Sequence, residues 1–416
     1  MRTSKRSLEK IVFSALIFAC CYAELVYAVN PVHPGGSNYG WYKIDAATQP
    51  APVGSNCREN YGIIKNYQNA GVRDLVINQL MQMKANGQQR LRVPLYHMRN
   101  ASGGTLLVSQ GGNLSAHDRE SLRLFLSDIR DIGFSEILFG FFPIGQNSPV
   151  NWPSWNEDLF QENWNLIANI RPIIKNSGIL YRIDLMNEGA PANHQTQLKE
   201  YVRKLWINYN LTYGKADTVG VSVIGQANEG DTTYRGTIDR YNTTKNIYDA
   251  TPFGSPYLWS IHFYANLKGN FLALDNAMNA RGDNTGIIIG ETFYDDAASW
   301  NAIKQTNISR TVWHVYQWPV TPSRGCDGHV DVTPPLKYRY HDSLTQTVNL
   351  APKGALDGID SNTGRVWGWA CDPSTPGQSA RVHFYADGPA GKGRLIKAIT
   401  ANKASGAAVK SACGGG

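Results

Sequence analysis

Two glutamates end apolar segments and are the residues best suited to chemistry. Glu188 ends the segment LYRIDLMNE, and Glu291 ends TGIIIGE. Each segment has the composition of a β-strand buried on both faces, where a carboxylate is costly to desolvate. Two carboxylates that share one site can act as nucleophile and proton donor when a glycosidic bond is cleaved. The sequence therefore predicts a paired-carboxylate active site.

Alternating strand-like and helix-like segments must position these glutamates. The strand-like segments are residues 38–44, 90–97, 136–144, 179–187, 218–225, 257–265, 286–291 and 311–318. The later ones are mostly apolar, as expected for parallel strands covered by helices. Eight strands with intervening helices predict an α/β fold, a (β/α)8 TIM barrel. A doubly wound open sheet is the alternative, which the lack of G-x-G-x-x-G after the first strand disfavours.

Apolar residues recur at helical spacing between the strand-like segments. They run from Val72 to Met83, from Leu122 to Ile129, from Trp164 to Ile170 and from Leu198 to Leu205. Ser115 and Asp118 form a capping-box pattern before the second of these helices, and Gly133 is a stop signal after it. We expect Pro172 to kink the third helix.

The strand count places the two glutamates across one cleft. Functional residues of a (β/α)8 barrel lie at the carboxyl ends of its strands. Glu188 follows the fourth strand and Glu291 ends the seventh, so their side chains face each other across the barrel mouth. A second Asn-Glu pair, Asn228-Glu229, follows the fifth strand. We interpret it as polar loop residues, although a different strand count would exchange the two pairs.

Further motifs stand on the predicted strands in an order known from one group of enzymes. They are Asn187-Glu188 after strand four, Glu291 on strand seven, Arg92 with Pro94 on strand two, His262 and Tyr264 as H-x-Y on strand six, and Trp318 ending strand eight. With these residues the chain resembles the retaining glycoside hydrolases of clan A, over residues 38–318. The resemblance implies a (β/α)8 catalytic domain that needs no metal and no cofactor.

The resemblance also implies roles for these residues. Glu188 would be the general acid/base and Glu291 the nucleophile. Asn187 would bind the sugar 2-hydroxyl, and Arg92 would keep the nucleophile ionised.

Tyr264 would donate to the nucleophile, and Trp318 would be a stacking floor for the sugar.

Three of these matches have structural alternatives when each is taken alone. Arg92 could instead form a salt bridge at the barrel rim, His262 could be a hydrogen-bonded core histidine, and Trp318 could be core.

Other residues near the predicted strand ends have two interpretations. Trp41, Tyr96 and His97 end strands one and two, and Trp152 and Trp155 lie in the loop after strand three. Aromatic rings can stack on the apolar face of a pyranose, or they can pack a long loop. No cluster of His, Cys and Asp has the spacing of metal ligands.

The charge and hydropathy of the chain exclude some partners. The formal net charge is +7, without basic runs, so we expect no nucleic acid. After the N-terminal segment, no stretch approaches about 18 consecutive apolar residues, so we expect no membrane span. We expect a monomer that acts on a polysaccharide or oligosaccharide.

The first 28 residues have the pattern of a secretory signal peptide. A basic start precedes the apolar residues 11–23, and Ala28 is the predicted last residue removed. The mature protein is therefore expected to be secreted, periplasmic or extracellular. A lipoprotein anchored at Cys20 is the alternative, which the bulky Phe18 disfavours.

Four cysteines follow the signal peptide, without C-x-x-C spacing: Cys57, Cys326, Cys371 and Cys413. An oxidising compartment favours disulfides, with Cys371–Cys413 the preferred pair and Cys57–Cys326 the second.

After the predicted barrel, helical patterns give way to short β-type segments separated by turn residues. Residues 29–343 are assigned to the catalytic domain, 344–354 to a linker and 355–416 to a small all-β sandwich-like module. Residues 354–373 and 382–389 resemble a module appended to bacterial secreted proteins. Since that module normally continues past the glycines, it is expected to be truncated at Gly416.

The sequence thus predicts hydrolysis of O-glycosidic bonds with retention. The alternatives are a transglycosylase that uses the same residues and a barrel that binds carbohydrate without cleaving it.

Overall fold

The computed structural model describes most of the barrel and parts of the C-terminal module. The described residues are 34–42, 62–101, 105–225, 232–292, 301–306, 310–318, 353–360, 363, 365–371, 380–386, 394–401, 403, 406 and 409. The signal peptide, the Asn228-Glu229 pair, most of the predicted linker and five of the six cysteines lie outside them.

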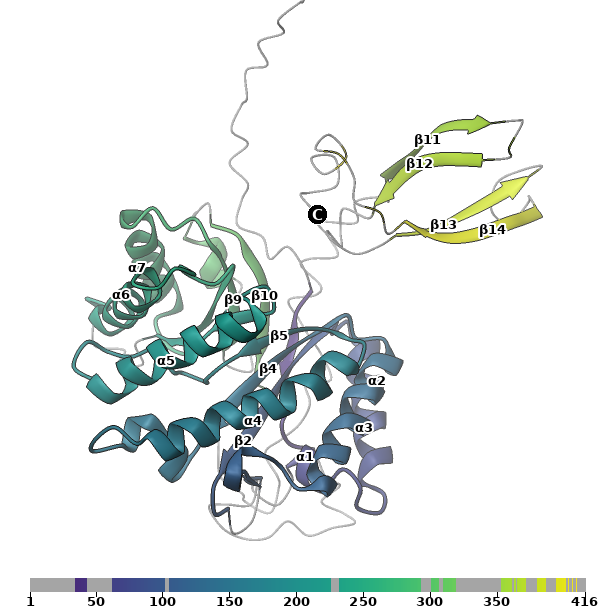
Figure 1. The fold of residues 1–416 in the computed structure, drawn as a ribbon. Helices are drawn as coiled ribbons and strands as arrows, with labels where there is room; N and C mark the ends of the chain where they lie inside the picture. Colours follow the sequence, from purple (N-terminus) through teal and green to yellow (C-terminus); the bar gives the residue numbers. More distant parts are fainter. Residues whose placement is uncertain are drawn as a thin grey trace, which may run out of the picture.

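Parallel strands form one curved sheet (Figure 1), in the order β6-β5-β4-β2-β1-β10-β9-β8-β7. They are β1 (Gly36–Asn38), β2 (Arg90–Met98), β4 (Glu136–Pro143), β5 (Leu180–Asp184), β6 (Thr218–Gly220), β7 (Val223–Ile224), β8 (Leu258–His262), β9 (Gly286–Glu291) and β10 (Val312–Gln317). β1 pairs with both β2 and β10, β6 pairs with β5, and β7 pairs with β8. Since two residues separate β6 from β7, these two pieces form the fifth strand. The predicted (β/α)8 barrel is confirmed.

The fifth strand, predicted as continuous, is interrupted for a steric reason. Gly220 adopts φ +70, and a Cβ there would meet Tyr248 Oη at 2.3 Å. Tyr248 Oη also accepts a hydrogen bond from the Val221 N–H at 3.0 Å. The tyrosine therefore occupies the place of a side chain and turns the strand between β6 and β7.

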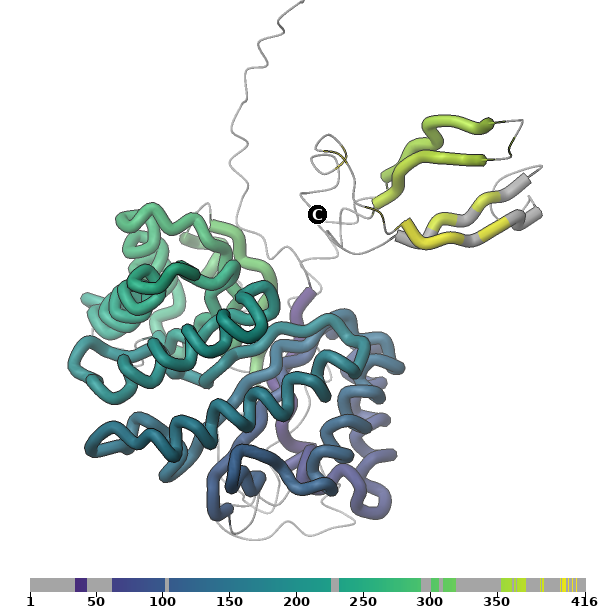
Figure 2. The backbone as a smooth tube through the Cα atoms, viewed as in Figure 1, coloured from purple at the N-terminus to yellow at the C-terminus, as the bar shows by residue number. Residues whose placement is uncertain are grey.

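Helices surround the strands (Figure 2), and α2, α3, α4 and α5 contain the four predicted apolar periodicities. They are α1 (Ile63–Asn66), α2 (Val72–Ala85), α3 (Ala116–Ile132), α4 (Glu157–Asn176), α5 (Thr196–Tyr213), α6 (Arg235–Asp249) and α7 (Leu267–Ala280). The capping box is confirmed, because Ser115 Oγ accepts from the Asp118 N–H at 3.0 Å. Gly133 ends α3 with φ +96. α4 continues four residues beyond Pro172.

Apolar residues inside the barrel form a core separate from the layer between strands and helices. Its members come from five strands: Leu138, Val219, Leu258, Ile288 and Tyr316. All are buried and fill the interior of the barrel. Charged side chains around Glu136 lie on one side of them, and charged side chains around Arg92 lie on the other.

Several predicted strand ends were wrong. β1 ends at Asn38, β5 at Asp184 and β8 at His262. β2 instead extends to Met98, because β3 (Leu107–Val108) pairs with its final residues. Arg92 is the third residue of this strand.

The described strands of the C-terminal module pair antiparallel, as expected for a small β-module. β11 (Lys353–Asp360) pairs antiparallel with β12 (Arg365–Cys371), and β13 (Ala380–Ala386) pairs with β14 (Arg394–Ala401). Cys371 is disulfide-bonded. Its partner lies outside the described residues, so the pairing with Cys413 stays a prediction. Within the described residues, no helix combines the length and apolar character that a membrane span requires.

Candidate active site

A β-bulge presents Glu291 at the carboxyl end of β9. Ile289 pairs with Ile261 of β8, but Glu291 pairs with the next residue, His262, so Gly290 is the extra residue. A Cβ on Gly290 would meet Ser260 Oγ at 2.4 Å. The close approach of the two strands thus requires glycine, and the bulge re-aims the carboxylate that follows.

Glu291 is buried and surrounded by donors. Arg92 Nη1 donates to its Oε1 at 2.5 Å, and Trp318 Nε1 donates to its Oε2 at 2.8 Å. Tyr264 Oη also donates to Oε2. Burial alone would raise the pKa of Glu291, but nearby His262 and Arg92 and these hydrogen bonds outweigh it, so the pKa lies below its ordinary value. Glu291 is therefore ionised, as a nucleophile must be.

The tyrosine beside Glu291 stays protonated. Burial raises the pKa of Tyr264 well above its ordinary value, and the negative charge of Glu291 raises it further. Tyr264 therefore remains a hydrogen-bond donor to the carboxylate over the whole range in which proteins are folded.

Arg92 lies at the centre of the site. Its Nη1 donates to Glu291 and, at 3.0 Å, to Asn38 Oδ1. Its Nη2 donates to Asp184 Oδ2 and to Asn187 Oδ1, each at 2.8 Å. The guanidinium is fully buried, and four directed bonds exceed what the three N–H donors of a lysine provide.

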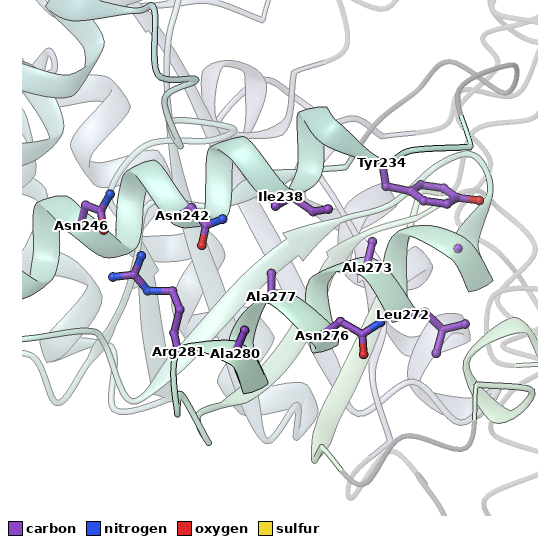
Figure 3. Close-up of a pocket in the computed structure, with 11 residues that line it drawn as sticks. Tyr234, Ile238, Asn242, Asn246, Leu272, Ala273, Asn276, Ala277, Ala280 and Arg281 are labelled. Carbon is purple, nitrogen blue, oxygen red and sulfur yellow. The ribbon is translucent and has the colours of Figure 1, made fainter.

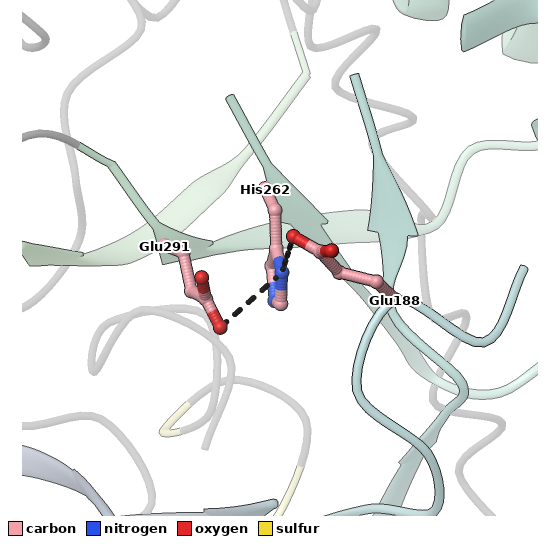
Figure 4. A group of neighbouring side chains, drawn as sticks. All are labelled: Glu188, His262 and Glu291. Carbon is pink, nitrogen blue, oxygen red and sulfur yellow. Dashed lines mark hydrogen bonds and ion pairs between the residues drawn. The ribbon is translucent and has the colours of Figure 1, made fainter. Parts of the chain in front are cut away.

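Glu188 approaches Glu291 from the opposite side of the mouth (Figure 4). Its Oε1 lies 3.3 Å from His262 Nδ1, which lies 3.4 Å from Glu291 Oε1. An oxygen of each glutamate and a ring nitrogen of His262 all lie within 4.8 Å of one another. Carboxyl groups are about 5–5.5 Å apart in retaining glycosidases and about 6.5–9.5 Å apart in inverting ones. The spacing favours retention.

The two glutamates differ in exposure. The Glu188 side chain is 31% exposed, whereas that of Glu291 is 4% exposed. Glu188 can therefore exchange protons with water at the mouth, while Glu291 is shielded. His262 is fully buried and touches both carboxylates, so it is more than a core histidine.

Glu188, His262 and Glu291 also have the donor types of a metal site. Glu291 already accepts from Arg92, Tyr264 and Trp318, however, and the Arg92 cation lies 2.5 Å from one of its oxygens. A divalent cation would have to displace these donors and sit beside a fixed positive charge. The donor set therefore fits proton transfer better than metal binding.

Aromatic rings continue from Trp318 along one side of the site. We call Trp41, Tyr96, Phe142 and Trp318 the aromatic row. Ring centroids lie 5.4 Å apart between Trp318 and Trp41, 5.3 Å between Trp41 and Tyr96, and 4.6 Å between Tyr96 and Phe142. Trp41 lies beyond β1 rather than at its end. Since Trp318 bonds Glu291, the row borders this carboxylate with an apolar surface of the kind on which a sugar face can stack.

Trp152 and Trp155, for which sugar stacking was one interpretation, pack against other side chains of the protein. Trp152 is buried, donates to the Gln146 carbonyl at 2.7 Å and packs edge-on against Tyr201. Trp155 packs against Phe160. The loop-packing interpretation therefore holds for this pair.

His97, at the end of β2, is also structural. It is buried, and its Nδ1 lies 3.1 Å from Ser109 Oγ. Burial lowers the pKa of His97 to about 3, so the ring is neutral. Tyr96, its neighbour, belongs instead to the aromatic row.

A groove of about 920 Å³ lies elsewhere, between α6 and α7 on the outside of the barrel (Figure 3). Its polar lining includes Asn242, Asn246, Asn276 and Arg281. No carboxylate is among the described residues that line it, so it lacks the groups of an acid–base site.

Sequence reasoning missed three residues of the site. Asp184 and Asn38 bond Arg92, and Ser222 bonds the backbone of Glu188. Asp184 carried a signal, since it is a charged residue inside an apolar strand. Asn38 and Ser222 carried none, because their roles depend on contacts between strands.

No family model matches the chain, and no curated protein is similar to it. Solved structures show distant likeness. GH5_18 from Bifidobacterium longum subsp. longum has 13% identity and a TM-score of 0.46, over 77% of this chain and 80% of that one. The endo-β-1,6-glucanase has 13% identity and a TM-score of 0.45, over 89% and 90%.

More distant matches include different enzymes. An exo-β-1,4-mannosidase from Opitutaceae bacterium strain TAV5 has 14% identity and a TM-score of 0.42, over 76% of this chain and 59% of that one. A homocysteine methyltransferase from Escherichia coli has 9% identity and a TM-score of 0.39, over 62% and 84%. At these TM-scores no likeness carries a functional argument, which has to come from the site.

Proposed function

We propose that the chain is a secreted retaining glycoside hydrolase. It would cleave O-glycosidic bonds of a polysaccharide or oligosaccharide through a covalent glycosyl-enzyme intermediate. The observation that carries the proposal is the spacing of Glu188 and Glu291, whose oxygens lie within 4.8 Å. Their environments support it, since one carboxylate is buried and ionised and the other is open to water.

The first displacement uses both glutamates at once. A carboxylate oxygen of Glu291 attacks the anomeric carbon and forms an ester as the bond to the leaving oxygen breaks. Glu188 gives its proton to that oxygen, so the leaving group departs as a neutral alcohol. Positive charge that develops on the sugar ring is stabilised by the negative charge of the site.

The second displacement releases the sugar. Glu188, now a carboxylate, takes a proton from water while the water oxygen attacks the anomeric carbon. The ester bond breaks, and Glu291 leaves as a carboxylate held by Arg92, Tyr264 and Trp318. Two inversions give net retention, and both glutamates return to their starting states.

Neighbouring residues would bind the sugar beside the nucleophile. Asn187 Oδ1 is engaged by Arg92, which directs the amide nitrogen as the donor toward a sugar hydroxyl. The indole of Trp318 is fixed by its bond to Glu291 and by contact with Trp41, so it offers a rigid floor.

Activity is tested on a panel of polysaccharides, scored by released reducing ends, with Glu291→Gln as the paired variant. We expect release by the wild type, none by the variant, and sugar binding by both. Unchanged hydrolysis in the variant would contradict the assignment. Binding without release by the wild type would indicate a carbohydrate-binding barrel, and elongated products would indicate a transglycosylase.

Secretion rests on the pattern of residues 1–28. Expression in a bacterium with an intact export pathway, followed by N-terminal sequencing of the exported protein, tests it. We expect the mature chain to begin at Val29. A chain that stays in the cytoplasm with its first residues intact would contradict this part of the proposal.

A further inference from the structure

The backbone of Glu188 has a conformation that its neighbours must impose. Its φ is +49, in the left-handed region, which only three non-glycine residues of the described part of the chain adopt. An L residue with a long side chain rarely stays there unless its surroundings hold it. The conformation occurs at the one residue that has to aim a carboxyl group at His262 and Glu291.

Ser222 holds this conformation. The N–H of Glu188 donates to Ser222 Oγ at 2.7 Å. Two residues further, the N–H of Ala190 donates to the Ser222 carbonyl at 3.1 Å. Ser222 is fully buried, so water does not replace either bond. Both sides of the turn that contains Glu188 are thus bound to a single residue of the next strand.

The break in the fifth strand is what makes Ser222 available. Ser222 lies between β6 and β7, where the strand turns at Gly220. Its N–H lies 3.1 Å from Asp184 Oδ1 and 3.3 Å from the Met186 carbonyl, rather than in a regular ladder. The interruption thereby directs the N–H, carbonyl and hydroxyl of one serine toward the end of β5.

Asp184 connects this turn to the nucleophile. It is fully buried, and its second oxygen, Oδ2, accepts from Arg92 Nη2 at 2.8 Å. Arg92 Nη1 in turn donates to Glu291. A continuous series of direct bonds therefore runs from Glu188 through Ser222, Asp184 and Arg92 to Glu291.

We propose that Ser222 and Asp184 are positioning residues that fix the acid/base at the spacing required for retention. They would not touch the substrate. Ser222 holds the backbone of Glu188, and Asp184 ties Ser222 to the arginine that holds Glu291. The proposal rests on the proposed glycosidase function and adds to it the elements that set the geometry of the catalytic pair.

The kinetic test is Ser222→Ala with two substrates of the same sugar. One is the natural oligosaccharide, whose leaving group needs a proton. The other is an aryl glycoside with a strongly acidic phenol, whose departure needs none. A misplaced acid costs about 100-fold. We therefore expect kcat/KM to fall about 100-fold for the oligosaccharide and less than about fivefold for the aryl glycoside.

Ser260→Ala is the matched control. Ser260 is a fully buried serine of the neighbouring β8, and its Oγ has no hydrogen-bond partner among the described residues. The same atom is removed without a bond to lose, so we expect less than about a twofold change with either substrate. Equal rates for Ser222→Ala and Ser260→Ala would overturn the proposal, as would equal losses on both substrates.

Ser222→Cys serves if the alanine variant does not fold. Sulfur fills the same space but accepts hydrogen bonds weakly. We expect the same difference between the two substrates with a smaller loss, about 10-fold on the oligosaccharide. A cysteine variant that cleaves both substrates at wild-type rates would overturn the proposal.

Hydrogen–deuterium exchange separates this proposal from the proposed function. In Ser222→Ala or Ser222→Cys, exchange in a peptide covering residues 185–190 should be at least about 10-fold faster than in Ser260→Ala, because the bond that protects the Glu188 N–H is weakened. This readout needs no substrate. A wild type that cleaves no glycoside would refute the function alone, whereas unchanged exchange would refute the role of Ser222.

Discussion

Two layers of buried ion pairs lie in the barrel interior, and they differ in the sign of their excess charge. In the layer near the start of β2, Glu136 accepts from Arg90 Nε at 2.9 Å and from Arg182 Nε at 2.8 Å. In the layer two residues further along, Arg92 donates to Asp184 and Glu291. We call these the Glu136 layer and the Arg92 layer.

The residue types are the same, but the ratios are reversed. The Glu136 layer has one carboxylate between two arginines and a formal charge of +1. The Arg92 layer has one arginine between two carboxylates and a formal charge of −1. The side chains of Arg90 and Glu136 are at most 5% exposed, and that of Arg182 is 22% exposed. An excess of negative charge suits a cationic transition state, whereas an excess of positive charge does not.

The largest expected effect comes from removing one carboxylate charge in each layer. Glu291→Gln should reduce kcat by about 10⁵-fold, because the covalent intermediate cannot form. Glu136→Gln should leave kcat within about threefold but reduce the free energy of unfolding by about 3–5 kcal/mol, since the buried Arg90 and the partly buried Arg182 both lose their partner. Steady-state kinetics and urea unfolding of both variants are the measurements.

Opposite results would remove the distinction between the layers. If Glu136→Gln lost as much activity per folded molecule as Glu291→Gln, the two layers would be functionally equivalent. If Glu291→Gln lost only stability, the Arg92 layer would have a purely structural role, like the Glu136 layer.

Glu188→Gln should reduce kcat/KM for an oligosaccharide by about 10²–10⁴-fold, the usual contribution of general acid catalysis. Azide, which needs no general base, should restore turnover of an activated aryl glycoside and give a glycosyl azide. Glu162→Gln is the control, because Glu162 bonds Arg99 and Asn147 rather than the Arg92 layer. Azide that restores no activity would argue against Glu188 as the acid/base.

Arg92→Lys should reduce kcat/KM by about 100-fold and the free energy of unfolding by about 3 kcal/mol. Lysine keeps the charge but cannot reproduce the four bonds of the guanidinium. Arg182→Lys, the same exchange in the Glu136 layer, should reduce stability alone. A loss of activity in Arg182→Lys but not in Arg92→Lys would show that the Glu136 layer, and not the Arg92 layer, supports catalysis.

Tyr264→Phe should move the acidic limb of the kcat/KM profile upward by about one pH unit. The hydrogen bond from Tyr264 stabilises the ionised form of Glu291 and contributes to its lowered pKa. Its loss raises that pKa, so protonation of the nucleophile begins at higher pH. A pH–rate profile between pH 3 and pH 7, about the range that contains this limb, is the measurement. An unchanged limb would separate Tyr264 from the ionisation of Glu291.

A lowered pKa also affects stability. The contribution of ionised Glu291 to folding is present above the pKa of an unfolded glutamate and is lost as the pH falls through its lower folded value. Acid unfolding of Tyr264→Phe should therefore begin at higher pH than that of the wild type.

The sequence was sufficient for the fold and for the residues that project from strand ends. Hydrophobic runs and the capping pattern at Ser115 predicted the order of strands and helices, because both are local signals. The strand-end motif placed Glu188 and Glu291 in one site, since carboxyl ends of parallel strands meet at one face of a barrel.

What the sequence did not predict depends on contacts across strands. The break at Gly220 arises because Tyr248, on α6, occupies the space of a side chain. The role of Ser222 follows from that break, and no local pattern marks it. The sequence left Trp152 with two interpretations, sugar stacking and loop packing, and its burial against Tyr201 supports packing.

Covalent trapping tests the central claim most directly. The wild type is incubated with a 2-deoxy-2-fluoro glycoside of the sugar released from its best polysaccharide, and the peptic peptides are analysed by mass spectrometry. We predict a single fluoroglycosyl ester on the peptide that contains Glu291, and none in Glu291→Gln. An ester on the peptide that contains Glu229, or no ester together with an inverted product, would contradict the account.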